Sequence, residues 1–209
     1  MRYIKIKKFL QEKEDVHWLV DGLLPNVGWT LFFGLKGIGK TTFAIQLCEA
    51  IQAGKPFLER KTKQTRILFI QADSKAIEWR AILDRVSPNN EGFTVVDVDG
   101  GALGRSSDLA SLQSFVDIIK PGFVVWDSLY KLAGEEINNP KILRSIEAMD
   151  KICEGIPWMV IHHPPHDQSR AAGSSSLGAN CSNEWCLLST KLRIDKGRLV
   201  KEKEVLMQR

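Results

Sequence analysis

Short runs of apolar residues alternate along the chain with stretches in which apolar side chains recur at helical spacing. The runs predict five buried strands, at residues 29–33, 67–70, 93–98, 123–126 and 158–161. They are almost continuously apolar, as is typical of strands that are covered on both faces of a sheet.

The stretches between these runs predict four helices, at residues 40–53, 74–86, 107–120 and 140–154. Gly54 ends the first helix, Ser107 is the expected N-cap of the third, and Asn139-Pro140 opens the fourth. The apolar side chains expected on one side of the second helix are Ile77, Ala81 and Ile82. Strands separated by helices imply right-handed crossovers, and therefore an α/β fold with a mostly parallel central sheet flanked by helices.

The end of the chain follows a different pattern. Residues 185–194 and 198–206 flank Asp195-Lys196-Gly197, which predicts a C-terminal antiparallel hairpin over residues 185–206. Residues 163–176 contain two prolines and read as a long loop. We expect residues 1–209 to form one domain, with residues 1–15 as an N-terminal extension.

The composition narrows the class of protein only slightly. With 44% hydrophobic and 26% charged residues the chain is not a disordered one, and its net charge of +4 permits an anionic partner without requiring it. None of the four cysteines forms a CxxC pair, which favours reduced thiols. No apolar run approaches the ~18 residues of a membrane span. No secretory signal opens the sequence, so we expect a cytoplasmic protein.

A phosphate-binding loop is the strongest motif. The sequence matches G-x-x-x-x-G-K-[ST] between the first predicted strand and the first helix, and its residues, with the one that follows, are Gly34, Leu35, Lys36, Gly37, Ile38, Gly39, Lys40, Thr41 and Thr42. Glycines let backbone N–H groups surround a phosphate, and the helix N-terminus adds partial positive charge. Lys40 then reaches the β- and γ-phosphates and the Thr41 hydroxyl ligates Mg²⁺. The motif therefore predicts ATP and Mg²⁺ as ligands.

Asp127 ends an apolar strand downstream of this loop. An aspartate in this position holds Mg²⁺ through water, opposite Thr41. The alternative interpretation of Asp127 is a residue that caps a helix or turn.

Several segments taken in order resemble the RecA-like ATPases. They are Asp21–Pro25 before the loop, Ile67–Ser74 after the first helix, Val160–Pro164 at the fifth strand, and Arg170–Ser175. The His-His and Gly-Ser pairs in the last two segments resemble most closely the RepA-type plasmid replicative helicases, with DnaB-type helicases more distant. The resemblance extends over about residues 16–206.

The resemblance implies roles for two further residues. In this family a glutamate after the second strand orients the attacking water, and the residue here is Asp73. Its side chain is one methylene shorter, which predicts slow hydrolysis. Its other interpretation is a helix N-cap. His162, at the end of the fifth strand, would contact the γ-phosphate, and its other interpretation is a histidine in a turn. His162, His163 and His166 lack the spacing of a zinc site.

The resemblance also implies a homo-oligomer, such as a hexamer, that acts on DNA. The loops expected to face DNA are residues 129–139, with Tyr130 and Lys131, and residues 163–176, with Arg170. Lys191 and Arg193 have the form of the pair that such rings insert into a neighbouring site, although a charged solvated face explains them as well.

The sequence leaves two functions open. The first is a RecA-like ATPase, such as a hydrolase of the helicase type, that acts on DNA in replication or recombination. Its catalytic residues would be Lys40, Asp73, Asp127 and His162. The second is a nucleotide-switched regulatory module with little or no hydrolysis, which the short Asp73 side chain favours. A P-loop kinase is disfavoured because no arginine-rich lid segment is apparent.

Overall fold

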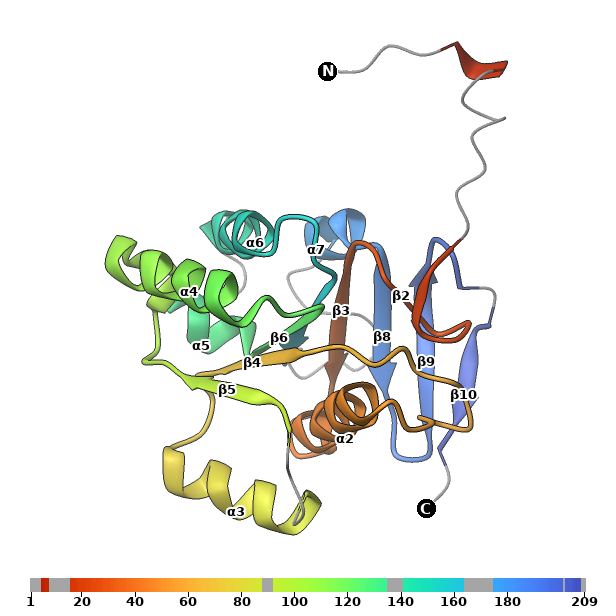
Figure 1. Ribbon diagram of the computed structural model, residues 1–209, viewed down its shortest axis with the longest axis horizontal. Coiled ribbons are helices and arrows are strands. Elements are labelled where there is room, and N and C mark those ends of the chain that lie inside the picture. The colour runs from red at the N-terminus through yellow and green to blue at the C-terminus, as the bar shows by residue number, and fades with distance from the viewer. Residues whose placement is uncertain are drawn as a thin grey trace.

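A twisted sheet runs through the centre of the protein (Figure 1). The computed structural model describes residues 5–7, 16–87, 92–134, 141–163, 175–200 and 202–207. Within these residues the sheet has eight strands in the order β10-β9-β8-β3-β7-β6-β4-β5. Their bounds are β3 Trp29–Gly34, β4 Ile67–Gln71, β5 Thr94–Asp97, β6 Phe123–Asp127, β7 Trp158–His162, β8 Asn183–Leu187, β9 Lys191–Gly197 and β10 Glu204–Leu206.

Six neighbouring strands pair in parallel, in the order β8-β3-β7-β6-β4-β5. Strands β9 and β10 continue the sheet beyond β8 and pair antiparallel. This arrangement confirms the predicted α/β fold with its C-terminal antiparallel hairpin. Strand β7 lies between β3 and β6, so the strand that leads into the phosphate-binding loop is not a neighbour of the strand that ends in Asp127. Because all six strands are parallel, their carboxyl ends share one edge of the sheet.

Helices cover both faces of the sheet. Figure 1 shows α2 and α3 on one face and α4, α5 and α6 on the other. The helix bounds are α2 Lys40–Ala53, α3 Ala76–Val86, α4 Ser106–Ile119, α5 Leu129–Ala133, α6 Lys141–Ile152 and α7 Ser175–Asn180, with a 3-10 turn η1 at Ala102–Gly104. A short antiparallel pair, β1 Trp18–Val20 and β2 Leu24–Pro25, precedes the main sheet. None of the helices in the part of the chain described could cross a membrane.

Two apolar cores result, one on each face. The core below α2 includes Phe32, Phe69 and Ile161, and the core below α4 and α6 includes Phe33 and Trp126. Neighbouring positions of β3 thus face opposite cores, as the two-residue period of a strand requires. Burial on both faces explains why the strands read as continuous apolar runs.

Helix α2 has the predicted bounds, and Gly54 ends it in the left-handed conformation with φ 65°. Helix α3 is correctly predicted but turns a different side to the core. Ile77 is 74% exposed, whereas Trp79 is buried and packs on Phe69 at a ring-centroid distance of 5.0 Å. Ile77, expected on one side of the helix with Ala81 and Ile82, therefore faces solvent, because the larger Trp79 ring sets the orientation of the helix.

Two predicted boundaries also differ. Helix α4 begins at Ser106 with Arg105 as its N-cap, so Ser107 is not the cap residue. The expected first arm of the hairpin, residues 185–194, is split between β8 and β9 by a turn that Leu188 N closes by donating to Lys191 O at 2.9 Å. Asp195-Lys196-Gly197 belongs to β9. The predicted opening of α6 at Asn139-Pro140 lies outside the described residues.

Candidate functional site

The phosphate-binding loop joins the end of β3 to the start of α2. Gly37 and Gly39 have φ angles of 79° and 100°, and a Cβ at either would meet no atom within 4 Å, so this side of the loop is open. Gly39 is the N-cap of α2, no side chain caps the helix, and its first turn holds no acidic residue. The first N–H groups of α2 are therefore available to an anion.

The back of the loop is closed. A Cβ on Gly34 would lie 2.7 Å from the carbonyl oxygen of Leu187, which explains why β8 can approach so closely. Lys40 folds over the loop, and its Nζ donates to the carbonyl oxygens of Gly34 and Leu35, at 2.8 Å each. Burial lowers the pKa of Lys40 to about 8, against the opposing effect of Asp127. The ammonium thus lies inside the loop, where a phosphate could replace the two carbonyls as its partner.

Thr41 and Asp127 meet beside the loop. The Thr41 hydroxyl donates to Asp127 Oδ2 at 2.7 Å, and Asp127 is 1% exposed. Burial raises the pKa of Asp127 to about 6. Its other oxygen, Oδ1, has no hydrogen-bond partner among the described residues. A hydroxyl and a carboxylate oxygen are the hard ligands that Mg²⁺ prefers, so these residues fit the ion that the motif implies.

Asp73 follows β4 on the same edge of the sheet. Helix α3 has Lys75 as its N-cap, so Asp73 does not cap it. Asp73 Oδ1 accepts a hydrogen bond from Ser128 Oγ at 3.1 Å, and Oδ2 lies 3.8 Å from His163 Nε2. Contact with His163 chiefly, opposed by partial burial and supported by Ser128, holds the pKa of Asp73 below its usual value.

His162 occupies the opposite face of the sheet from this cluster. In the parallel ladder Asp127 pairs with Ile161, and His162 pairs with Phe33. Paired residues project to the same face, so Ile161 shares the face of Asp127, while His162 is fully buried on the face that carries Phe33. The predicted γ-phosphate contact of His162 gains no support from this placement.

The sequence does not predict the place of His163 beside Asp73, since there His163 is only part of the His-His pair and of a rejected zinc site. The signal that could have revealed it is the two-residue period counted from Asp127 through the neighbouring strand. His166 lies outside the described residues, and the part of the chain that is described holds no group of three histidine, cysteine or acidic residues suited to a metal ion. All four cysteines are free and buried.

A cavity of about 350 Å³ adjoins the loop on its β8 side. Its walls come from the end of β3, the first half of the loop and the turn between β8 and β9, and the apolar part includes Leu35, Ile38, Leu187 and Leu188. Asp127 and Asp73 lie on the other side of the loop, beyond β7. The open loop therefore has a carboxylate cluster at one end and an apolar cavity at the other.

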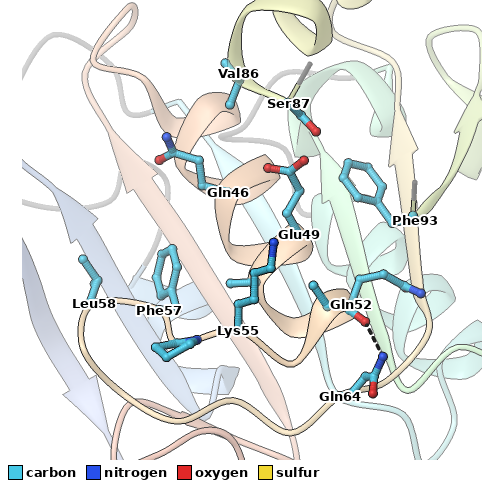
Figure 2. A pocket seen from close by; sticks show the side chains of 14 residues that line it. Gln46, Glu49, Gln52, Lys55, Phe57, Leu58, Gln64, Val86, Ser87 and Phe93 are labelled. Carbon is cyan, nitrogen blue, oxygen red and sulfur yellow. Dashed lines mark hydrogen bonds between the residues drawn. The ribbon is translucent and has the colours of Figure 1, made fainter. Parts of the chain in front are cut away.

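A larger hollow, of about 760 Å³, lies away from this site (Figure 2). It borders the second half of α2, the segment after it, the end of α3 and the residues just before β5, and Figure 2 shows Glu49 between Gln46 and Phe93 with Lys55 nearby. Burial raises the pKa of Glu49. A carboxylate disfavours a phosphate ligand, and the loop N–H groups lie at the other end of α2, so this hollow is not the phosphate site.

The residues considered for DNA and neighbour contacts are only partly described. Residues 129–133 form helix α5 rather than a loop, and residues 135–139, as well as Arg170, lie outside the described residues. Lys191 donates to Glu204 at 2.8 Å, and Arg193 is paired with Asp195 on the same strand. Both cations thus have partners within this chain.

Comparisons with known proteins identify a family and a fold. A family model described as an AAA domain matches residues 3–169. No curated protein matches the sequence. Among solved structures, a KaiC-like protein from the hyperthermophilic archaeon Pyrococcus horikoshii OT3 is similar with a TM-score of 0.61 and 16% identity, covering 91% of this chain and 94% of that one. At this identity the likeness establishes the fold, a RecA-like P-loop fold.

Proposed function

Because the chain belongs to the AAA domain family, we propose that it binds Mg·ATP at the phosphate-binding loop and hydrolyses it to ADP and phosphate. The observation that carries the proposal is the convergence of Lys40, Thr41 and Asp127 beside an open, uncapped helix N-terminus. A chance glycine-rich turn would not place an ammonium, a hydroxyl and a buried carboxylate around one anion-binding loop.

The two ends of the loop give the nucleotide a direction. A triphosphate laid along the loop with its γ-phosphate toward Asp127 directs the nucleoside to the apolar cavity beside Leu187. The reverse direction would bring the phosphates to an apolar surface and the base to two carboxylates. The volume of about 350 Å³ is within the range of small-ligand sites.

Each residue has a defined task in the hydrolysis. Lys40 exchanges its two carbonyl partners for phosphate oxygens and offsets their negative charge. Thr41 and Asp127 would hold Mg²⁺, which supplies further neutralisation of the β- and γ-phosphate oxygens. Asp73 accepts a hydrogen bond from the attacking water. The oxygen of this water bonds to the γ-phosphorus while the bond to the β–γ bridging oxygen breaks; ADP leaves, and the protons of the water remain on the released phosphate.

Binding is tested by titrating a fluorescent ATP analogue into the protein with Mg²⁺. Lys40→Ala removes the buried ammonium and is expected to weaken binding at least about 10-fold, whereas Lys36→Ala, on the same loop with an exposed side chain, should change it less than about 2-fold. Equal affinities of the two variants for the ATP analogue would contradict nucleotide binding at this loop.

The competing function is a nucleotide-switched module with little hydrolysis. What favours it is the length of Asp73, whose carboxylate is one methylene short of a glutamate and is already engaged by Ser128. Asp73→Glu separates the two functions. A rise in turnover would show that positioning of water limits the native enzyme, whereas tight ATP binding without turnover in both proteins would support the switch.

We extend the proposal to an oligomer that acts on DNA, in the manner of the RepA-type helicases that the sequence resembles. Support comes from the His-His and Gly-Ser pairs of the sequence and from the RecA-like fold. Single-stranded DNA should raise the ATPase rate several-fold, and a non-hydrolysable ATP analogue should increase the mass in solution. A monomeric protein with a rate indifferent to DNA would contradict this extension.

A further inference from the structure

The edge of the sheet next to the phosphate site carries a three-residue cluster from three adjacent strands. Asp73 follows β4, Ser128 follows β6 and His163 follows β7. In the sheet, β6 lies between the other two strands, so Ser128 stands in the middle and the two remaining residues reach toward each other across it. Neighbouring strands lie about 4.8 Å apart, a span that these side chains can bridge.

We propose that Ser128 and His163 are positioning residues that hold the Asp73 carboxylate in the orientation needed to direct water at the γ-phosphate. The inference rests on the proposed ATPase function and assigns residues to it that the loop motif does not contain. Ser128 donates to Oδ1 at 3.1 Å, and His163 Nε2 faces Oδ2 at 3.8 Å. Each oxygen of the carboxylate thus has its own neighbour.

The arrangement restrains Asp73 without blocking it. A carboxylate oxygen accepts two hydrogen bonds, so each oxygen of Asp73 retains a position for water. About one third of the Asp73 side chain is exposed, which gives water access to it. The restraint matters because Asp73 lies outside the regular strand, and a free rotation of its side chain would spread the water over several positions.

His163 has no competing task among the described residues. Its Nδ1 is buried without a hydrogen-bond partner there, and its Nε2 lies 3.8 Å from Asp73 Oδ2, while its charge acts only as a minor influence on Asp127. Lys131 on α5 adds a weaker favourable field at Asp73. The geometry therefore assigns His163 to the carboxylate rather than to the metal position between Thr41 and Asp127.

The test compares turnover and binding in matched variants. His163→Ala and Ser128→Ala should each lower kcat about 10-fold to 10²-fold, with KM and affinity for the fluorescent ATP analogue within about 2-fold of the native values. His163→Gln, which restores an N–H donor of similar reach, should recover part of the loss. His17→Ala and Ser111→Ala change exposed residues elsewhere and should leave turnover unaltered.

A double variant tests whether His163 influences turnover through Asp73. If His163 acts through Asp73, His163→Ala should lower turnover no further in an Asp73→Ala background. Additive losses, or a changed KM with an unchanged kcat, would overturn the proposal while leaving the ATPase function in place. A wild-type protein without any ATP turnover would instead refute the proposed function.

A second readout does not depend on turnover. Because the His163 and Ser128 contacts favour the ionised carboxyl, His163→Ala should raise the pKa of Asp73, as followed by carbon NMR of the Asp73 carboxyl group in metal-free protein. An Asp73 carboxyl that titrates identically in the native and His163→Ala proteins would overturn the positioning role even if the enzyme hydrolyses ATP.

Discussion

Thr41 and Thr42 are neighbours of the same residue type with different expected roles. The Thr41 hydroxyl contacts Asp127, and in the site proposed here it is also a ligand of Mg²⁺. Thr41→Ala removes this ligand and should weaken the Mg²⁺ dependence of ATP binding, whereas Thr41→Ser retains the hydroxyl. Titration of Mg²⁺ at fixed ATP measures this dependence. A Thr42→Ala control with as large an effect as Thr41→Ala would contradict the assignment of the ligand.

Two residues far from the site carry backbone strain. Leu58 and Glu59 have φ angles of 48° and 62° in a turn closed by two hydrogen bonds between Phe57 and Arg60. Such turns favour glycine, because an L-residue in this conformation costs about 1–2 kcal/mol.

Glu59→Gly should therefore raise the free energy of unfolding by about 0.5–1 kcal/mol, after allowance for the greater entropy of glycine in the unfolded chain. Denaturant unfolding measures it. Glu59→Ala keeps the unfavourable conformation and should bring no gain. A destabilised Glu59→Gly protein would show that contacts of the Glu59 side chain outweigh the strain.

The residue types of the phosphate site could be predicted from sequence, but not every contact among them. Lys40 and Thr41 belong to a motif with fixed spacing, and Asp127 ends an apolar strand whose carboxyl end falls on the same edge of a parallel sheet. His163 is different, because its role depends on the sheet face that it reaches beyond the end of β7. His162 and His163 both follow the apolar run of the fifth strand, and the register of β7 against β6 decides which of them reaches Asp73.

At the scale of elements, α3 attaches to the sheet through few buried side chains. Trp79 is its one fully buried residue and packs against Phe69 and the surrounding core, whereas Ile77 faces solvent. Trp79→Ala should lower the free energy of unfolding by about 3–5 kcal/mol. Ile77→Ala, on the same helix, should change it by less than about 0.5 kcal/mol. Similar losses for the two variants would contradict the observed orientation of α3.

The tail shows why element boundaries are harder to predict than elements. The strongest turn signal near the C-terminus, Asp195-Lys196-Gly197, forms the end of β9 just before the connection to β10, whereas the turn between β8 and β9 at residues 188–190 contains no glycine, proline or asparagine. Pairing decides the outcome, since β8 pairs with β3 and its partner β9 must extend to Gly197 to complete the ladder. Tertiary contacts of this kind are absent from the local sequence.

For the whole molecule, the parallel order of the sheet gathers the phosphate site from distant parts of the sequence. The carboxyl ends of β3, β4, β6 and β7 bring the loop, Asp73, Asp127 and His163 to one edge, which is the usual place of a ligand in such sheets. The alternation of strands and helices predicted this fold class and the edge.

ATP hydrolysis at the phosphate-binding loop is best tested by phosphate release from Mg·ATP, measured for the wild-type protein beside Lys40→Ala. We expect multiple turnovers by the wild type and a rate at background for Lys40→Ala, since the ammonium proposed to contact the phosphates is lost. Equal rates in the two proteins, with and without single-stranded DNA, would contradict the assignment of this loop as the site of ATP hydrolysis.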